Sequence, residues 1–401
     1  MDKPRPPREP DVIAPAPPTK RNTVEKTGTK TTPDSQRVST LSDPNLVTAL
    51  VQYGTDLVSL FPKSVKAITI GSEVSRVNIV VASEYVSALH CKLERKGTTL
   101  RATDLSKNGT FFEGQRERWF YLRPGKTFIA GALPHCFLAL NDPMRESYPE
   151  LVDLLGAANE HVIGSLRDTP SPSDVIVAAV AGAPILITSE PDCDQHRLAR
   201  IIHRVSRCCE REIVERTPKD LPADHKAQDE LIKKRARRST FVLDLGVHGE
   251  PLDPHFVAML FKPRYQVRVV VLARSIDVVD KALGRAHAGK LSEIWLRPIA
   301  SRPEAIDRLF DRVLEEHNSP LRMSFLTPEN QEAIRNYSWP DNFASLRLAA
   351  RRLTAIARLG TIHKAAHALG VGSSSLYHWY HTTLKLAEPL SRRLIPRDNR
   401  D

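Results

Sequence analysis

The pattern of apolar residues changes from region to region along the chain. The first segment, residues 1–44, has almost no large apolar residue. Residues 1–44 crowd prolines at the start, followed mainly by Lys, Arg, Thr and Ser. Such a segment cannot bury enough apolar surface to offset its chain entropy. We therefore expect residues 1–44 to be a disordered, proline- and threonine-rich tail.

Short apolar runs with alternating or β-branched character occupy residues 45–143. Turn residues separate these runs at short spacing, which predicts an all-β sandwich or barrel. The runs are SVKAITIG (64–71), VNIVVA (77–82), HCKLERK (90–96), TTLRATDL (98–105) and KTFIAG (126–131).

Nearly continuous apolar runs alternate with helical segments between residues 150 and 300. This alternation predicts an α/β domain with a parallel sheet, because helices cover both faces of parallel strands. The expected strands are PILITS (184–189), STFVLDLG (239–246) and QVRVVVLA (266–273), and the expected helices are DVIVAAVA (174–181) and a segment around 195–209.

Helical periodicity continues from residue 301 to the end of the chain. We expect a helical lid over 301–358, followed by a compact helix pair and a tail over 359–401. In the pair, Gly370 ends the first helix, and Ser373 or Ser374 can cap the second. The pair follows the helix-turn-helix plan of DNA-binding proteins, or it is a plain αα-hairpin packed on the lid.

The inner faces of the two C-terminal helices are small or apolar. The residues expected there are Ala365, Ala366 and Leu369 on the first helix, and Leu376 with Trp379 or Tyr380 on the second. Basic residues flank the pair at Arg351, Arg352, Arg358, Lys364, Arg392 and Arg393. Small residues at the crossing and basic flanks favour the DNA-binding interpretation.

Charge and composition narrow the classes of function. The 401 residues carry a formal net charge of +11, which favours anionic partners, nucleic acid first. The basic run at 233–238 fits either a solvated face or contact with nucleic acid phosphates. Five cysteines without a C-x-x-C pair predict neither a zinc site nor a disulfide framework.

Hydropathy also bears on location. No run approaches the roughly 18 consecutive apolar residues of a membrane span, and the N-terminus lacks the apolar core of a signal peptide. We therefore expect a cytoplasmic protein with no membrane partner.

Polar loops in the β region are candidates for anion binding. The stretch DLSKNGTF (104–111) is a polar turn entering a strand, and Asn108–Gly109 supplies the positive φ that such turns need. Ser87, Ser106, Lys107 and Asn108 would offer many donors at one end of a sandwich, which suits a phosphate. The alternative is a hairpin without a ligand.

The order and spacing of several motif residues in this region resemble those of the forkhead-associated (FHA) domain. The resemblance rests on Gly71, Ser87-x-x-His90, Asn108-Gly109-Thr110, Leu122-x-x-Gly125, Phe128 and Gly131, over about 70 residues. It implies an eleven-stranded β-sandwich that binds phosphothreonine peptides through the loops at one end. His90 would brace these loops.

Carried over residue by residue, the resemblance implies a phosphopeptide site. Ser87 would contact the phosphate, while Lys107 and Asn108 would lie on the peptide-binding loop, with Asn108 holding the peptide backbone. Where the family has its phosphate-binding arginine, this chain has Ser72. Arg76, four residues later, is the candidate to replace that charge.

The segment order from 160 to 350 resembles the AAA+ domain of sigma-54-dependent transcription activators. HVIGSLRD (161–168) is similar to their entry motif, and RLARIIHRVS (197–206) to the helix after their phosphate loop. STFVLD (239–244) is similar to their Walker B strand, and SWPDNFASL (338–346) to their W-P-G-N-x-R-E-L signature.

The residues that handle ATP in that family are replaced here. Gln195 stands in place of the phosphate-loop lysine, and Asp192 and Asp194 stand where anionic phosphates would lie. Asp244 keeps the metal-binding position of the Walker B strand, but Leu245 replaces the glutamate that activates water. We expect a degenerate, non-hydrolysing core with no cofactor, no metal and no enzyme activity.

Two further replacements agree with this expectation. Ala344 stands at the position of the sensor arginine, and nothing between about 210 and 238 is similar to the G-A-F-T-G-A loop that engages sigma-54. The domain is then a scaffold, with homo-oligomerisation as one role.

The run K-A-A-x-x-L-G-V-x-x-x-x-L-Y resembles the Fis-type helix-turn-helix that ends most sigma-54 activators. The resemblance implies that Ser374, Ser375 and His378 face bases or phosphates and that Lys364 contacts the DNA backbone. Dimerisation, which presents two such helices to two half-sites, would then matter.

Three functions remain open on the sequence. The preferred one is a bacterial transcription regulator whose FHA domain senses a phosphothreonine protein, or a threonine of its own tail such as Thr32 before Pro33. The second is a phosphopeptide-binding adaptor or scaffold without DNA binding. The third is a residual ATPase.

Overall fold

The computed structural model describes residues 43–55, 57–156, 170–388 and 390. Several sequence-based expectations lie outside these residues: the tail with Thr32, the HVIGSLRD segment and the flanking Arg392 and Arg393. Among the described helices, none is long and apolar enough to cross a membrane.

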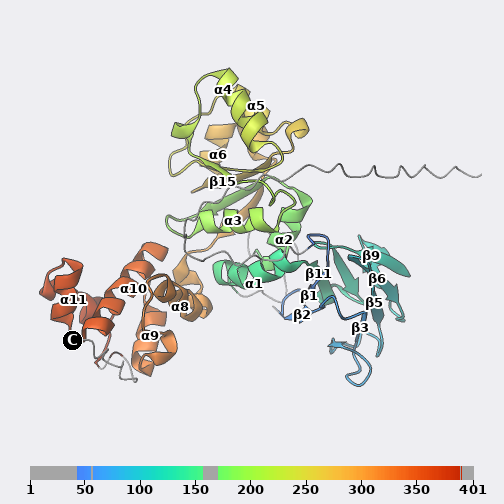
Figure 1. The fold of residues 1–401 in the computed structure, drawn as a ribbon, viewed down its shortest axis with the longest axis horizontal. Helices are drawn as coiled ribbons and strands as arrows, with labels where there is room; N and C mark the ends of the chain where they lie inside the picture. The colour runs from blue at the N-terminus through green and yellow to red at the C-terminus, as the bar shows by residue number, and fades with distance from the viewer. Residues whose placement is uncertain (1–42, 56, 157–169, 389, 391–401) are drawn as a thin grey trace, which may run out of the picture. The chain divides into compact units, whose positions relative to one another are not determined.

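Two sheets form the first region, as the alternating runs predict, and their strands pair antiparallel except for the short parallel pair β3 and β4 (Figure 1). One sheet has the strand order β2-β1-β11-β10-β7-β8, and the other β4-β3-β5-β6-β9. The strands are β1 Ala49–Gln52, β2 Val58–Leu60, β3 Ala67–Gly71, β4 Ile79–Val80, β5 Cys91–Lys96, β6 Thr99–Asp104, β7 Thr110–Phe112, β8 Gln115–Arg116, β9 Trp119–Leu122, β10 Thr127–Ala130 and β11 Cys136–Leu140.

Alternation along the strands builds the core of this sandwich. In β5, Cys91 and Leu93 are buried while Lys92 and Glu94 point outward. Rings from both sheets meet inside, and Phe112 stacks on Phe120 at 4.5 Å between ring centroids. The polar loops that follow β3, precede β5 and follow β6 are thereby held on a rigid frame.

Helix α1 (Asp142–Leu155) follows the last strand directly. Asn141 caps it, since its side chain accepts from the Met144 N–H at 3.0 Å. Pro149 lies inside the helix, and an interior proline removes one backbone hydrogen bond. The apolar side chains of α1 belong to one buried cluster with α3 (Gln195–Val205).

A five-stranded parallel sheet forms the second region, with the order β13-β14-β15-β12-β16. Ile185 and Ile187 of β12 point into one buried cluster and Leu186 into another, so both faces are covered and the strand is apolar throughout. The strands are β12 Ile185–Ser189, β13 Val214–Arg216, β14 Thr240–Asp244, β15 Arg268–Ala273 and β16 Ser292–Leu296.

Helices connect these strands, and the α/β expectation is confirmed. Helix α3 ends at Val205, four residues before the predicted end, because Ser206 leaves the helical conformation. The other helices are α2 Pro172–Ala181, α4 His225–Glu230, α5 Pro254–Leu260, α6 Ile276–Leu283 and α7 Arg285–Ala288. The basic run begins on a π-helical segment, Leu231–Ala236, where Lys234 pairs with Glu230 at 3.0 Å, and it ends in the turn that follows, at Arg237 and Arg238.

The C-terminal part is helical, as predicted. Its helices are α8 Ile306–Glu316, α9 Pro328–Asn336, α10 Asn342–Leu359, α11 Ile362–Leu369 and α12 Ser373–His378. Gly370 ends α11 in the left-handed conformation, with φ of 66°. Neither Ser373 nor Ser374 caps α12; its N-cap is Gly372, so that part of the prediction was wrong. Tyr380 is buried beside Leu376, whereas Trp379 is only half-buried.

Candidate functional site

Three loops meet at one end of the β-sandwich, and we call this the recognition end: residues 72–76, 83–90 and 104–109. The Lys107 N–H donates to the Ser87 hydroxyl at 3.2 Å, and the Ser72 N–H donates to the Ser87 carbonyl at 3.0 Å. The Asn108 side-chain amide donates to the Tyr85 carbonyl at 2.9 Å. The residues predicted from the resemblance, Ser72, Ser87, Lys107 and Asn108, therefore lie together.

The buried side chain of His90 connects two loops of the recognition end. Its Nδ1 accepts from the Ser87 N–H at 3.2 Å, which leaves Nε2 as the donor to the Gly109 carbonyl at 3.2 Å. The ring is fully buried, and burial lowers the pKa of this imidazole. A neutral His90 thus joins two loops, which is the bracing role expected from the sequence.

Asp104 organises the third loop, and the sequence reasoning missed it. Its carboxylate accepts from the Ser106 N–H at 3.1 Å, the Ser106 hydroxyl at 2.6 Å and the Thr110 hydroxyl at 2.8 Å. The Ser106 hydroxyl oxygen then accepts from the Gly109 N–H at 2.8 Å. The available signal was an aspartate two residues before a polar turn residue, the spacing of an Asx-turn.

The backbone conformation at position 109 favours glycine. Gly109 has φ of 93°, and a Cβ there would lie 2.4 Å from Nε of Arg116. Arg116 in turn donates to the Lys107 carbonyl at 3.1 Å. The close approach of Arg116 therefore fixes the peptide that presents Lys107.

Charge at the recognition end is mixed. The side chains of Lys107 and Asn108 are exposed, whereas Ser87 is half-buried. Arg76, the candidate for the phosphate-binding arginine, pairs with Glu73 at 3.1 Å between Nε and Oε2. The Glu73 N–H donates to the Ala88 carbonyl at 3.2 Å, so a carboxylate lies on the loop next to Ser87. A phosphate arriving there meets both a cation and its anionic partner.

A second candidate site is the strand–helix corner, residues 189–195 between β12 and α3. Gln195 is the first residue of α3, and Asp244 is the last residue of β14. His196 connects the two elements, since its Nε2 lies 3.1 Å from Oδ2 of Asp244. Its Nδ1 lies 3.4 Å from Oε2 of Glu215, on β13.

His196 and Asp244 each change the pKa of the other. The hydrogen bond to Asp244 raises the pKa of His196 against the opposing effect of burial, and His196 lowers the pKa of Asp244. Arg200 also binds Glu215, at 2.8 Å. The Asp244 carboxylate thus has a hydrogen-bonding partner within the chain.

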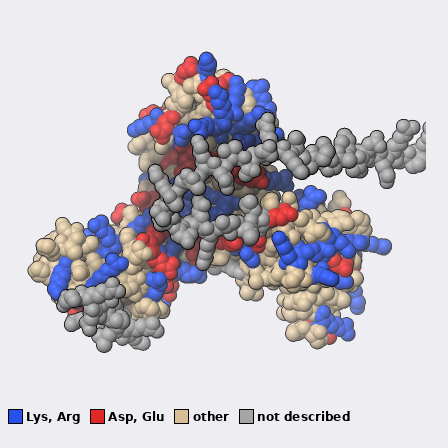
Figure 2. Space-filling view, viewed as in Figure 1, with Lys and Arg blue, Asp and Glu red and all other residues tan. Residues whose placement is uncertain are grey.

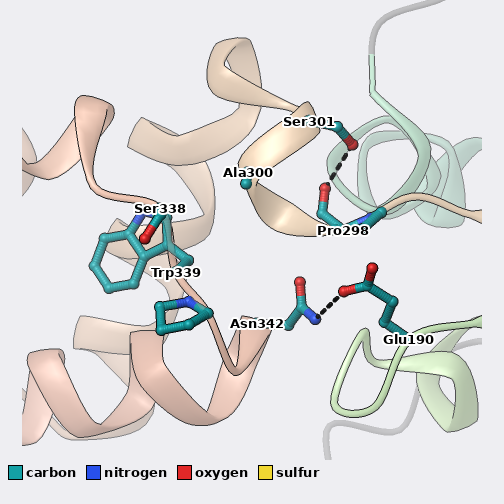
Figure 3. Close-up of a pocket in the computed structure, with 8 residues that line it drawn as sticks. Glu190, Pro298, Ala300, Ser301, Ser338, Trp339 and Asn342 are labelled. Carbon is teal, nitrogen blue, oxygen red and sulfur yellow. Dashed lines mark hydrogen bonds between the residues drawn. The ribbon is translucent and has the colours of Figure 1, made fainter.

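A cavity of about 370 Å³ lies beside the corner (Figure 3). It is near the carboxyl ends of β12 and β16, which are neighbours in the sheet, and the loop before α10 closes its other side. Glu190 reaches into it and accepts from the Asn342 amide at 3.4 Å. The lining residues are Glu190, Pro298, Ala300, Ser301, Ser338, Trp339, Pro340 and Asn342.

The four predicted DNA contacts lie on the surface of the C-terminal helices. Lys364 on α11 and Ser374, Ser375 and His378 on α12 are all exposed. Beneath them, Ala365, Ala366, Leu376 and Tyr380 are buried together in one cluster. One basic flank is engaged within the chain, because the Arg352 guanidinium lies 4.7 Å from the Trp379 ring centroid.

Acidic and basic residues are interspersed over the visible face of the molecule (Figure 2). Within the residues that the structure describes, no group of three or more His, Cys, Asp or Glu side chains is arranged to hold a metal ion.

Comparisons with known proteins bear on the first site. Residues 68–129 match the family model of the FHA domain. The crystal structure of the FHA domain of the CT664 protein from Chlamydia trachomatis is 22% identical, with a TM-score of 0.22, and the match covers 23% of this chain and 95% of that chain. EmbR from Mycobacterium tuberculosis, in complex with a low-affinity phosphopeptide, is 25% identical with a TM-score of 0.21, over 24% of each chain.

A second kind of match covers a larger share of the chain. NtrX from Brucella abortus is 14% identical, with a TM-score of 0.36, and covers 59% of this chain and 71% of that chain. No curated protein sequence matched. The family match and the two-sheet sandwich agree over the same residues, and residues 68–129 are therefore an FHA domain within a longer chain.

Proposed function

We propose that this protein is a bacterial transcription regulator that binds a phosphothreonine partner through its FHA domain and DNA through its C-terminal helices. The observation that carries the proposal is the recognition end. There, Ser87 and the Lys107 peptide are joined, while the side chains of Lys107 and Asn108 stay exposed to a ligand. Ordered loops with exposed donors suit a phosphorylated peptide.

A degenerate library of phosphothreonine peptides tests the first half of the proposal. We expect saturable binding to the full chain that is lost for the same peptides without phosphate. Ser87→Ala should weaken binding at least tenfold, because it removes a hydroxyl from the phosphate site and an acceptor for the Lys107 N–H. Equal binding of phosphorylated and unphosphorylated peptides would refute phosphothreonine recognition.

The C-terminal helices support the DNA-binding half. Polar side chains of α12 are exposed above a buried Leu376, as a helix that enters a major groove requires. A gel shift across the promoter of the chain's own gene should give a salt-dependent complex that is lost in the double variant Ser374→Ala/His378→Ala. Tyr377→Phe, which keeps the exposed ring at a neighbouring position, is the folded control.

An adaptor without DNA binding is the second candidate. It is favoured by the small number of cations on α11 and α12, where Lys364 stands without an arginine. Phosphopeptide binding together with no sequence-preferring DNA shift would establish this candidate in place of the regulator.

We also propose that the α/β core hydrolyses no ATP and that the protein is not an enzyme. His196 occupies the Asp244 carboxylate, and Leu245, at the position of the water-activating residue, is buried and apolar. Steady-state phosphate release should equal that of Asp244→Ala. A rate above that of the variant would instead identify a residual ATPase.

The chain itself can supply partners in this proposal, namely its own N-terminal tail and a second copy of the chain. In this proposal, a phosphorylated threonine of the N-terminal tail is a ligand of the FHA domain, in the same molecule or in a neighbouring one. Deletion of residues 1–40 should then change kinase-dependent behaviour and oligomeric state, and an unchanged response would remove the idea.

A further inference from the structure

Two arginines from separate helices bind one carboxylate of the strand–helix corner. Nη2 of Arg347, on α10, lies 3.0 Å from Oδ1 of Asp194, and Nη2 of Arg312, on α8, lies 3.3 Å from Oδ2. Asp194 is 14% exposed and Arg312 15%. Each carboxylate oxygen thus has its own arginine. Arg312 and Asp194 are largely buried, whereas Arg347 is 41% exposed and also pairs with Glu316 at 3.5 Å.

Arg312 depends on this contact. Its Nε and Nη1 are buried and have no hydrogen-bond partner, so Asp194 is the acceptor that its guanidinium reaches. Both guanidinium groups also lie over the buried Phe343 ring, at 5.2 Å for Arg312 and 5.4 Å for Arg347 from its centroid. The ring and the carboxylate together fix the two cations close to each other.

The backbone of the corner is attached to the same helix. The Phe343 N–H donates to the Asp192 carbonyl at 2.9 Å, and the Asn342 side chain donates to the Pro191 carbonyl at 3.1 Å. The side-chain Oδ1 of Asn342 accepts from the Ile299 N–H at 2.9 Å. The start of α10 is therefore joined to the corner and to the segment after β16 (Figure 3).

Backbone conformation marks this junction as specific. Asp192, Asp194 and Asn342 all have positive φ, at 56°, 66° and 47°. Such conformations persist in residues other than glycine where the surrounding contacts determine them. Three of them meet at one contact between segments about 150 residues apart in the sequence.

We infer that Arg312 and Arg347 form an anion-binding site whose ligand is the chain's own Asp194. Paired guanidinium groups that converge on two oxygens are the chemistry that recognises phosphate, and here a carboxylate takes that place. A phosphate would have to displace Asp194 and would meet Glu190 and Asp192 on the same loop. The helices α8 and α10 are consequently held to the corner without any nucleotide.

Amide hydrogen exchange of the full chain tests the contact. Asp194→Asn preserves the shape and removes the charge, and asparagine tolerates positive φ. We expect exchange in α8 and α10 to rise about tenfold, since a buried guanidinium loses its partner, while the FHA strands stay unchanged. Asp192→Asn is the matched control, because Asp192 is exposed on the same loop with a similar φ. Equal exchange in the wild type and Asp194→Asn overturns the inference.

A double-mutant cycle keeps the inference testable if one variant folds poorly. Arg347→Ala combined with Asp194→Asn should perturb α10 by less than the sum of the two single changes, because the contact between Arg347 and Asp194 is lost in both. Fully additive effects overturn the pairing.

Inorganic phosphate tests the anion site itself. Asp194→Gly vacates the site and suits the positive φ, so 10 mM-range phosphate should raise its unfolding temperature, whereas the wild type and Asp192→Gly should not respond. A shift of equal size in the wild type, or no shift in Asp194→Gly, overturns the assignment. Phosphate release and DNA binding are measured separately, so the outcome is independent of the proposed function.

Discussion

The recognition end of the FHA domain and the strand–helix corner both place polar residues on loops at the end of a sheet, but they use them differently. At the recognition end, His90 and Asp104 fix the loop backbones, and Lys107 and Asn108 remain exposed. At the corner, Asp194 is engaged by two arginines. A loop that binds an external ligand keeps donors available, whereas a loop whose charges are paired within the chain serves the fold.

The largest expected effect is at Asp104. Asp104→Ala removes the acceptor of three hydrogen bonds, so we expect it to lower the free energy of unfolding by about 2 to 4 kcal/mol and to abolish phosphopeptide binding. Urea unfolding and peptide titration measure the two effects. Thr103→Ala, on the same strand, is the control. An Asp104→Ala protein that still binds peptide would show that the loop is ordered by other contacts.

Glu73→Ala should have a smaller effect on phosphopeptide affinity, and it should raise that affinity where Asp104→Ala abolishes it. It frees Arg76 and removes a negative charge next to Ser87, so phosphopeptide affinity should rise by about three- to tenfold. Titration of the variant at low salt measures this effect. Glu73→Ala combined with Arg76→Ala should lose the gain; if the double variant keeps it, Arg76 is not a phosphate ligand.

The pH dependence at His196 is expected to be smaller still. Because Asp244 raises the pKa of His196, its stabilisation is complete below the unfolded pKa of about 6.5 and is lost as the pH rises through the folded value. The pair is partly exposed, so the effect should stay below about 1 kcal/mol.

The measurement is the difference in unfolding temperature between the wild type and His196→Gln at pH 6 and pH 8. This difference isolates His196 from His90 and His203, whose pKa values are lowered by burial and whose contributions have the opposite sign. A difference that grows from pH 6 to pH 8 contradicts the pairing with Asp244.

The smallest expected effect is at position 195. Gln195→Lys restores the lysine of a phosphate loop, yet we expect no measurable ATP binding, because Asp194 still holds both arginines and His196 still holds Asp244. Titration with a fluorescent ATP analogue checks this. Saturable binding by the single variant would mean that the corner lacks only its lysine.

Local pattern in the sequence predicts much of the fold. The alternation in β5 and the apolar run of β12 identify both sheet types, and Gly370 identifies the end of α11. β13 escapes notice because it has only three residues, and β16 because Ser292 and Glu293 interrupt its apolar run. Pro149 obscures the helical pattern of α1.

The two candidate sites also differ in how far the sequence predicts them. Ser87, Lys107 and Asn108 lie within about 20 residues of one another, and a family pattern records their spacing. Arg312 and Arg347 follow Asp194 by 118 and 153 residues, and their role depends on how α8 and α10 meet the corner. No local sequence pattern predicts how α8 and α10 pack against the corner. The absence of a lysine at position 195, by contrast, can be read from the sequence alone.

Asp194 has a consequence for what this core can respond to. A nucleotide acts on a binding site according to its concentration, and the site reports that concentration as it fills and empties. A carboxylate within the chain has a local concentration that the fold sets, and neither metabolism nor dilution changes it. The contact of the arginine pair is therefore constant, and under the proposed function a change in the state of the protein would enter at the recognition end.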